Sequence, residues 1–315
     1  MSITITGGFT STGGGFTLVA APTPKKAIFG YGYSTGFTAI TNLVSNTGVV
    51  SNDVTGVGTA RNALAASGYG TDKAIFGYGG DSQDMVSMTN LVSNTGVVAT
   101  DTTGVGTARS YLAAAGYGTD KAIFGYGTTN VSSGQSMTNL VTNTGVVGNN
   151  VTGVGTIRWG LAAAAYGGDK AIFGYGGGAD NTIMYSLTNL VSNTGVVATN
   201  TTGVGTARQR LAAAGYGTDK AIFGYGYDNN LPAYISITNL VSNTGVVASN
   251  TTGVGTARRD LAAADYGIGL ALFGYGYNGT TVVAITNLVS NTGVVATDTA
   301  GVGTARSDLA AAAYG

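Results

Sequence analysis

The side chains that could carry out chemistry in this chain are few in kind. Its 315 residues include no His, no Cys and no Glu, and all 14 acidic residues are Asp. This composition excludes thiol chemistry, imidazole acid–base catalysis and zinc bound by Cys or His. A hydrolase with paired carboxylates would have to use residues such as Asp81 and Asp84, which lie in one segment with no second acid placed by the sequence. We therefore expect no enzymatic activity, no cofactor and no metal site.

Six arginines recur at the end of a repeated motif, G-V-G-T-[AI]-R. They are Arg61, Arg109, Arg158, Arg208, Arg258 and Arg306. One interpretation is a ring of guanidinium groups that binds an anion near a central axis. The alternative, which we favour, is a structural side chain that satisfies carbonyl groups between neighbouring repeats. Repeated Asp-Lys pairs, as at Asp120-Lys121, indicate turns with a solvated Lys, because one carboxylate per turn is too few for calcium.

The arginine motif belongs to a unit that occurs six times with a period of 47 to 50 residues. Each unit also contains L-A-A-A or a close variant, A-[IL]-F-G-Y-G and T-N-L-V. In the third copy these motifs predict strands A (residues 112–117), B (121–126), C (around 140–142) and D (146–152), separated by glycine-rich turns. Four short strands per unit are typical of a propeller blade. The expected fold is therefore all-β, a six-bladed β-propeller with four antiparallel strands per blade.

The order of the motifs predicts how such a ring closes. The repeats begin at strand B, near Lys26, and end with strand A, after Arg306. The C-terminal strand A must then join the N-terminal strands B, C and D, which removes exposed sheet edges. Strand A is rich in Ala, as expected where six blades converge on the axis. We expect two parts, an arm of residues 1–25 and a propeller of residues 26–315.

The unit resembles the kelch repeat. The pattern R-x-x-L-A-A-A-x-Y-G followed by K-A-I-F-G-Y-G extends over residues 26–315, although G-Y-G stands in place of the double Gly and no Trp closes strand C. The resemblance implies the propeller fold. Kelch-type copper oxidases require His, Tyr and Cys around the metal, and six-bladed sialidases carry S-x-D-x-G-x-T-W boxes. This chain lacks those features.

The repeats differ from one another mainly in two regions. The first lies between G-Y-G and T-N-L-V, in residues 33–40, 80–88, 128–137, 177–187, 227–237 and 277–285; the second is the residue pair after each repeated Arg. In an antiparallel four-stranded blade, both regions emerge on the same face, and the nearly constant turns emerge on the opposite face. Either the surface has drifted, or it is a binding face that diversified on a fixed scaffold.

The variable regions are rich in Tyr, Trp and Arg, which are enriched in binding hot spots. The candidate ligand-binding residues are Tyr33, Phe37, Asp81, Asp84, Tyr111, Trp159, Tyr185, Arg210, Tyr227, Asp228, Tyr234, Arg259 and Tyr277, with Asp180 beside them.

The first 25 residues lie outside the repeat. Residues 2–6 and 16–20 predict short strands, and Pro22 and Pro24 indicate a stiff exit toward the propeller. An N-terminal arm joined to nearly identical blades resembles structural proteins of tailed bacteriophages, such as tail fibres and virion decorations. We therefore expect a non-enzymatic component of the virion, an extracellular particle. Its arm would bind other virion proteins, and its variable face would bind a host glycan or protein or a neighbouring virion protein.

The alternative is a free lectin-like or protein-binding propeller. The formal net charge of zero gives no reason to expect a nucleic-acid partner. No apolar run is long enough to predict insertion into a membrane.

Overall fold

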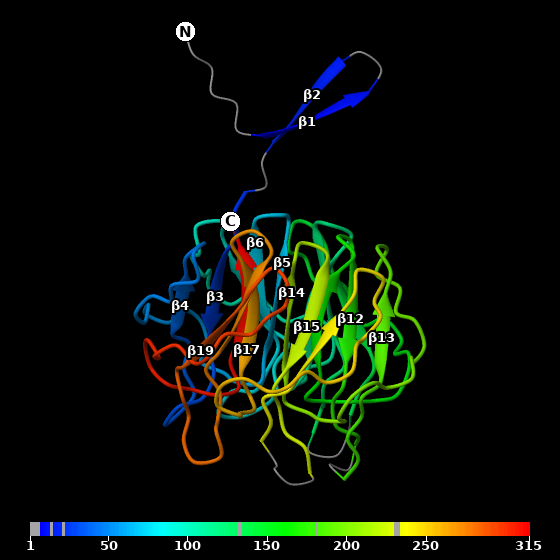
Figure 1. Cartoon of the computed structure of the whole chain (residues 1–315). Coiled ribbons are helices and arrows are strands. Elements are labelled where there is room, and N and C mark those ends of the chain that lie inside the picture. The colour runs from blue at the N-terminus through cyan, green and yellow to red at the C-terminus, as the bar shows by residue number, and fades with distance from the viewer. Residues whose placement is uncertain (1–6, 13–14, 21–22, 131–133, 180–181, 230–233) are drawn as a thin grey trace.

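The computed structural model describes residues 7–12, 15–20, 23–130, 134–179, 182–229 and 234–315. Over these residues the chain is all-β, with one two-stranded hairpin and six three-stranded antiparallel sheets (Figure 1). No helix in the described part of the chain is long and apolar enough to cross a membrane. The repeated sheets confirm the predicted all-β, propeller-like class.

Each repeated sheet has an inner, a middle and an outer strand. The inner strands are β5 (Ala65–Tyr69), β8 (Ala113–Tyr117), β11 (Ala162–Tyr166), β14 (Ala212–Tyr216), β17 (Ala262–Tyr266) and β20 (Ala310–Tyr314). The middle strands are β3 (Lys26–Gly30), β6 (Lys73–Gly77), β9 (Lys121–Gly125), β12 (Lys170–Gly174), β15 (Lys220–Gly224) and β18 (Leu270–Gly274). The outer strands are β4 (Thr41–Val44), β7 (Thr89–Val92), β10 (Thr138–Val141), β13 (Thr188–Val191), β16 (Thr238–Val241) and β19 (Thr286–Val289).

The middle strands are buried on both faces because each sheet packs between two neighbours. In β3 the residues Ala27, Ile28 and Phe29 have no exposed surface. The strand ends at Gly30, where a Cβ atom would lie 2.6 Å from Cζ of Phe76 in the next sheet. A side chain at Gly30 would therefore displace that aromatic ring. The same Gly–Phe contact recurs between every pair of neighbouring sheets.

The segment that follows each outer strand pairs with it only through isolated bridges. In the third sheet, Val147 bridges Val141 and Val151 bridges Thr138. The two bridged residues are four positions apart in this segment but only three positions apart in the outer strand. One extra residue of the segment therefore bulges out of the ladder. This mismatch is why the residues predicted as strand D form two bridges rather than a continuous strand. The bulge also directs the side chain of Asn150 toward Thr107 of the preceding repeat.

The six sheets are linked in a cycle. The C-terminal strand β20 pairs with β3, so one sheet has the order β20-β3-β4, in agreement with the predicted overlap of the chain ends. The inner strands contact one another in sequence from β5 to β20, and β20 contacts β5 again. Near the end of each inner strand, a backbone N–H donates to the turn of the adjacent sheet. One such bond runs from Gly315 N to Asp72 O (2.8 Å) and joins the last repeat to the first full one.

The N-terminal hairpin is separate from the repeated sheets. It consists of β1 (Gly7–Thr12) and β2 (Gly15–Ala20), and it projects from the end of the body where the chain finishes (Figure 1). The strand predicted for residues 16–20 corresponds to β2, whereas the one predicted for residues 2–6 lies outside the described residues. The connection is bonded to the body at Lys25, whose N–H donates to Gly267 O and whose Nζ lies 2.8 Å from Oδ2 of Asp265.

Candidate binding site

The structure brings the two variable regions together. The residue after each repeated Arg bridges the first residue of the variable segment in the same repeat, as in Asn62 with Gly80 and Gln209 with Tyr227. The constant turns lie at the other end of the sheets, where Asn94 Nδ2 donates to Oδ2 of Asp72 (3.1 Å). We call these two ends the variable side and the constant side. This arrangement agrees with the prediction from topology.

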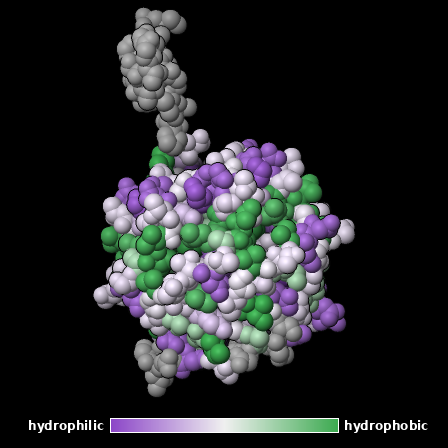
Figure 2. All heavy atoms as spheres, turned by 90° about the vertical axis from the view of Figure 1, so that its right-hand side faces the viewer, coloured by the Kyte–Doolittle hydropathy of each residue, from purple (hydrophilic) through white to green (hydrophobic). Residues whose placement is uncertain are grey.

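Packing between repeats explains why the turns on the constant side vary so little. Gly48 has a φ of +83°, and a Cβ atom there would lie 2.7 Å from the ring of Tyr266 in the neighbouring sheet. Ser45 Oγ accepts hydrogen bonds from the N–H groups of Thr47 and Val49. Packing between repeats does not cover the valines at the Val49 position, which are 62–67% exposed in all six repeats. Figure 2 shows hydrophobic residues in an interrupted band around the side of the body.

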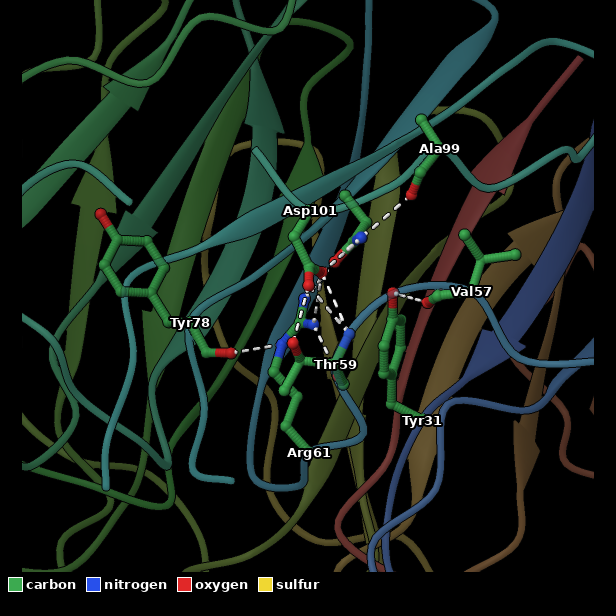
Figure 3. Close-up of polar contacts among 8 residues, drawn as sticks. Tyr31, Val57, Thr59, Arg61, Tyr78, Ala99 and Asp101 are labelled. Carbon is green, nitrogen blue, oxygen red and sulfur yellow. Dashed lines mark hydrogen bonds and ion pairs between the residues drawn. The ribbon is translucent and has the colours of Figure 1, made fainter. Parts of the chain in front are cut away.

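The repeated arginines are structural side chains. Arg61 has no exposed surface, and its guanidinium lies 4.3 Å from the ring centroid of Tyr31 in the preceding repeat. Its Nε donates to Tyr78 O (2.9 Å) and its Nη2 to Oδ1 of Asn90 (2.6 Å), both in the following repeat (Figure 3). Burial lowers the pKa of Arg61 and raises that of Tyr31 to about 12. An arginine enclosed in this way joins two repeats and has no surface to offer an anion.

The centre of the variable side is a closed ring of backbone hydrogen bonds. Six residues, one per repeat, each donate an N–H to the carbonyl of the next member around the ring, at 2.6–2.9 Å. This axial ring consists of Ala63, Tyr111, Gly160, Arg210, Asp260 and Asp308. All six have φ between 51° and 59°, a region that favours glycine, and yet only one of them is glycine. Backbone strain of this kind is concentrated at functional sites.

Side chains of the axial ring interact across the axis. Arg210 Nη1 lies 3.1 Å from Oδ2 of Asp260, and its guanidinium stacks 4.8 Å from the ring centroid of Tyr111. Burial, together with the neighbouring Asp260 carboxyl, raises the pKa of Asp308 to about 7. Burial and the Asp308 carboxyl also raise the pKa of the Tyr111 hydroxyl. Four ring members from four repeats therefore form one polar cluster.

A second cluster adjoins the axial ring through Asp260. Arg259 lies among three half-buried tyrosines, with its guanidinium carbon 5.2, 5.7 and 5.6 Å from the ring centroids of Tyr227, Tyr234 and Tyr277. Its Nε is 3.3 Å from Oδ2 of Asp260, so one carboxylate connects the two arginines of the site. We call this group the tyrosine–arginine patch. With the axial ring it unites six of the predicted residues: Tyr111, Arg210, Tyr227, Tyr234, Arg259 and Tyr277.

Trp159 supports this site from beneath. Only 6% of its surface is exposed, its Nε1 donates to Gly178 O (2.8 Å), and its ring meets that of Tyr111 edge-on at 5.4 Å. Arg210 also lies over the indole, 5.4 Å from its centroid. Trp159 therefore holds Tyr111 and Arg210 in place.

The other predicted residues lie apart from the axial ring. Tyr33 and Phe37 form an exposed edge-to-face pair of their own (5.4 Å). Asp81 Oδ1 accepts the N–H groups of Gln83 and Asp84, so these two acids shape a turn and do not form a facing pair. The remaining predicted residues are Tyr185 and Asp228, which are half-buried, and Asp180, which lies outside the described residues.

Two acids that complete the site were not among the predicted residues. Asp260 and Asp308 occupy the same position of the repeat as Tyr111 and Arg210. This shared position is the feature of the sequence that could have identified them as site residues. Among the described residues, no group of three acidic or other metal-ligating side chains could hold a metal ion.

The constant side has a larger central well of about 330 Å³. Its wall is formed by inner-strand residues such as Ala114 and Ala163, and lysines surround its mouth. Four of these lysines are paired with the preceding residue, as in Lys73 with Asp72 (2.9 Å) and Lys121 with Asp120 (2.8 Å), and Lys25 is paired with Asp265. The wall of the well therefore carries small apolar side chains, and the positive and negative charges at its mouth balance one another.

Comparison with known proteins adds no relative. No protein-family model matches the chain, and no curated protein matches it either.

We expect the free energy of unfolding to fall as the pH rises from about 4 to 7. A typical Asp has a pKa near 4. The folded state, in which burial raises the pKa of Asp308 to about 7, therefore holds a proton that the unfolded chain has already lost. This advantage disappears as the pH passes through that interval, at a cost of up to about 4 kcal/mol. Denaturation at several pH values should show the slope in the parent chain and a flat profile in Asp308→Asn.

Few other groups can produce that slope, because the chain has no His, Glu or Cys. Equal slopes for the parent chain and Asp308→Asn would show that Asp308 is not the titrating group.

Proposed function

We propose that the chain is a six-bladed β-propeller of the kelch type and that it acts as a binding module rather than an enzyme. In this proposal each bridged segment after an outer strand counts as the fourth strand of a blade, shortened by its bulge. The cyclic contacts of the inner strands and the pairing of β20 with β3 support it.

The binding role rests on one observation, the tyrosine–arginine patch on the side where the repeats differ. Tyrosine and arginine provide large contact areas and several hydrogen bonds at a small cost in conformational entropy. Residues of the constant side cannot vary in the same way, because its turns form contacts between repeats. Side chains that vary on a rigid frame suit recognition better than catalysis, which would need acids or nucleophiles in a facing geometry.

We further propose that the hairpin displays this module on a larger assembly, as in a tailed-phage virion. The separation of β1 and β2 from the repeated sheets supports that role, because a two-stranded hairpin can add strands to a sheet of another protein. The alternative is a free lectin-like or protein-binding propeller. Removing residues 1–22 distinguishes the two, since a virion component would lose incorporation into particles and a free lectin would keep its function.

The variant Tyr227→Ala/Tyr277→Ala tests the binding role. We label the variant and the parent chain and measure their binding to a printed glycan array and to fixed bacterial cells. We expect the signal of the variant to be at least tenfold lower, because both rings adjoin Arg259. Tyr33→Ala is the matched control, since Tyr33 lies on the same side but outside the patch. Undiminished binding by the double variant, at an unchanged melting temperature, would refute a role for the patch.

A further inference from the structure

A cavity of about 100 Å³ lies on the axis within the axial ring. It is lined by the six ring residues and by the leucines that follow them, such as Leu112 and Leu211. Ala63 and Gly160 contribute almost no side-chain volume, whereas Tyr111, Arg210, Asp260 and Asp308 contribute polar groups. The space is therefore small, walled by leucine at one end, and surrounded by both positive and negative side chains.

The hydrogen-bonding groups around this cavity are incompletely satisfied. Four buried side-chain atoms form no hydrogen bond within the described part of the chain, and all four are on ring residues or their immediate neighbours. Two are donors, Arg210 Nε and Arg259 Nε, although the latter is in ionic contact with Asp260. Two are acceptors, Gln209 Oε1 and Asp308 Oδ1. Arg210 and Asp308 line the cavity, whereas Gln209 and Arg259 lie beside lining residues. Buried polar atoms normally have partners, so Arg210 Nε and Asp308 Oδ1 indicate a place where a ligand or water supplies them.

The mixture of donors and acceptors restricts the chemistry of such a ligand. An anion would suit the two guanidinium groups, but both already contact Asp260, whose carboxylate would repel it. A cation would suit the two carboxyl groups but would be repelled by Arg210. A hydroxyl group both donates and accepts, so a neutral polyhydroxyl ligand can satisfy both kinds of atom. The tyrosines of the adjoining patch offer rings against which the apolar face of a sugar can pack.

We propose that the axial cavity receives hydroxyl groups of a neutral hexopyranose unit, held from the side by the tyrosine–arginine patch. This inference rests on the proposed binding function and names the class of its ligand. The cavity is too small for a whole sugar ring, so it takes one edge of the ring while the tyrosines cover a face.

Calorimetric titration of the full chain with methyl glycosides of glucose, galactose and mannose tests the proposal. We expect saturable binding of at least one neutral glycoside and at least tenfold weaker binding of methyl glucuronide. Ala63→Phe fills the cavity without removing a polar group, and we expect at least a tenfold loss of affinity. Lys121→Ala is the control, because Lys121 lies on the constant side in an exposed pair with Asp120; its affinity should be unchanged.

A second variant covers the case in which Ala63→Phe does not fold. Asp308→Asn preserves the volume of the side chain but changes its hydrogen bonding, and it should weaken the neutral glycoside at least fivefold. The proposal is overturned if no neutral glycoside binds, if only the acidic one binds, or if neither variant changes the affinity. In those cases the array and the cells could still bind the parent chain better than the Tyr227→Ala/Tyr277→Ala variant. That result would support the proposed binding role with a different ligand.

Discussion

Replacing Arg109 by leucine is expected to lower the free energy of unfolding by about 3–5 kcal/mol. The guanidinium is fully buried, and its three nitrogens donate to Tyr126 O (2.8 Å), Thr107 O (3.0 Å) and Asn139 Oδ1 (2.7 Å). Leucine fills much of the same volume but leaves these three acceptors without a donor. Each orphaned buried acceptor costs about 1–3 kcal/mol. Chemical denaturation at a fixed pH measures the loss.

The conservative change Arg109→Lys should recover only part of that stability. A single ammonium cannot reach three acceptors that are arranged for a planar guanidinium, and it loses the stacking on Tyr78 (4.4 Å). Lys121→Ala is the control on an exposed pair with Asp120, and it should leave the denaturation midpoint unchanged. A loss below about 1 kcal/mol in Arg109→Leu would contradict the structural role given to all six arginines.

The arginine network explains why the repeats change so little outside their variable regions. Each arginine stacks on a tyrosine of one repeat and donates a hydrogen bond to an asparagine of the next, as Arg61 does with Tyr31 and Asn90. The tyrosines concerned have φ near +63°, an unfavourable conformation that the surrounding bonds enforce. A change in any one of the three residues therefore affects two repeats.

The regular features of the fold could be predicted from the sequence because they repeat. Six copies of A-[IL]-F-G and T-N-L-V indicated the middle and outer strands, and the order of the motifs indicated that the chain ends share a sheet. The way in which the segment after each outer strand pairs with that strand could not be predicted. It depends on a one-residue mismatch between Val141–Thr138 and Val147–Val151, which appears only when the pairing partners are known.

The candidate site was predictable in part for a related reason. Tyr227, Tyr234 and Tyr277 stand out by residue type, so a search for aromatic residues in variable segments finds them. Asp260 and Asp308 do not stand out, because their significance lies in their proximity to Arg210 and Tyr111, which are 50 to 197 residues away in the chain. Only the closed geometry of the axial ring brings these four residues together.

Removing residues 307–315 is expected to abolish cooperative folding. The deletion takes away β20, all of whose residues are buried, and exposes the edge of β3. It also breaks the ring on both sides of the body, where Asp308 accepts from Ala63 and Gly315 donates to Asp72. Burial of Leu309 and Tyr314 alone contributes about 2 kcal/mol each, and the lost backbone bonds bring the total near the 5–15 kcal/mol that stabilises a typical domain. Thermal melting followed by circular dichroism, with limited proteolysis, measures the outcome.

A deletion at the other end provides the comparison that identifies the cause. Removing residues 1–22 takes away the hairpin but keeps Lys25 and its bonds to the body, so we expect an unchanged melting midpoint. The truncated chain without β20 should aggregate through its open edge, and a synthetic peptide of residues 307–315 added during refolding should restore part of the soluble, protease-resistant fraction. A sharp unfolding transition in the chain without β20 would mean that the ring does not need its last strand. In that case the stability would reside in each pair of neighbouring sheets, as in an open repeat array.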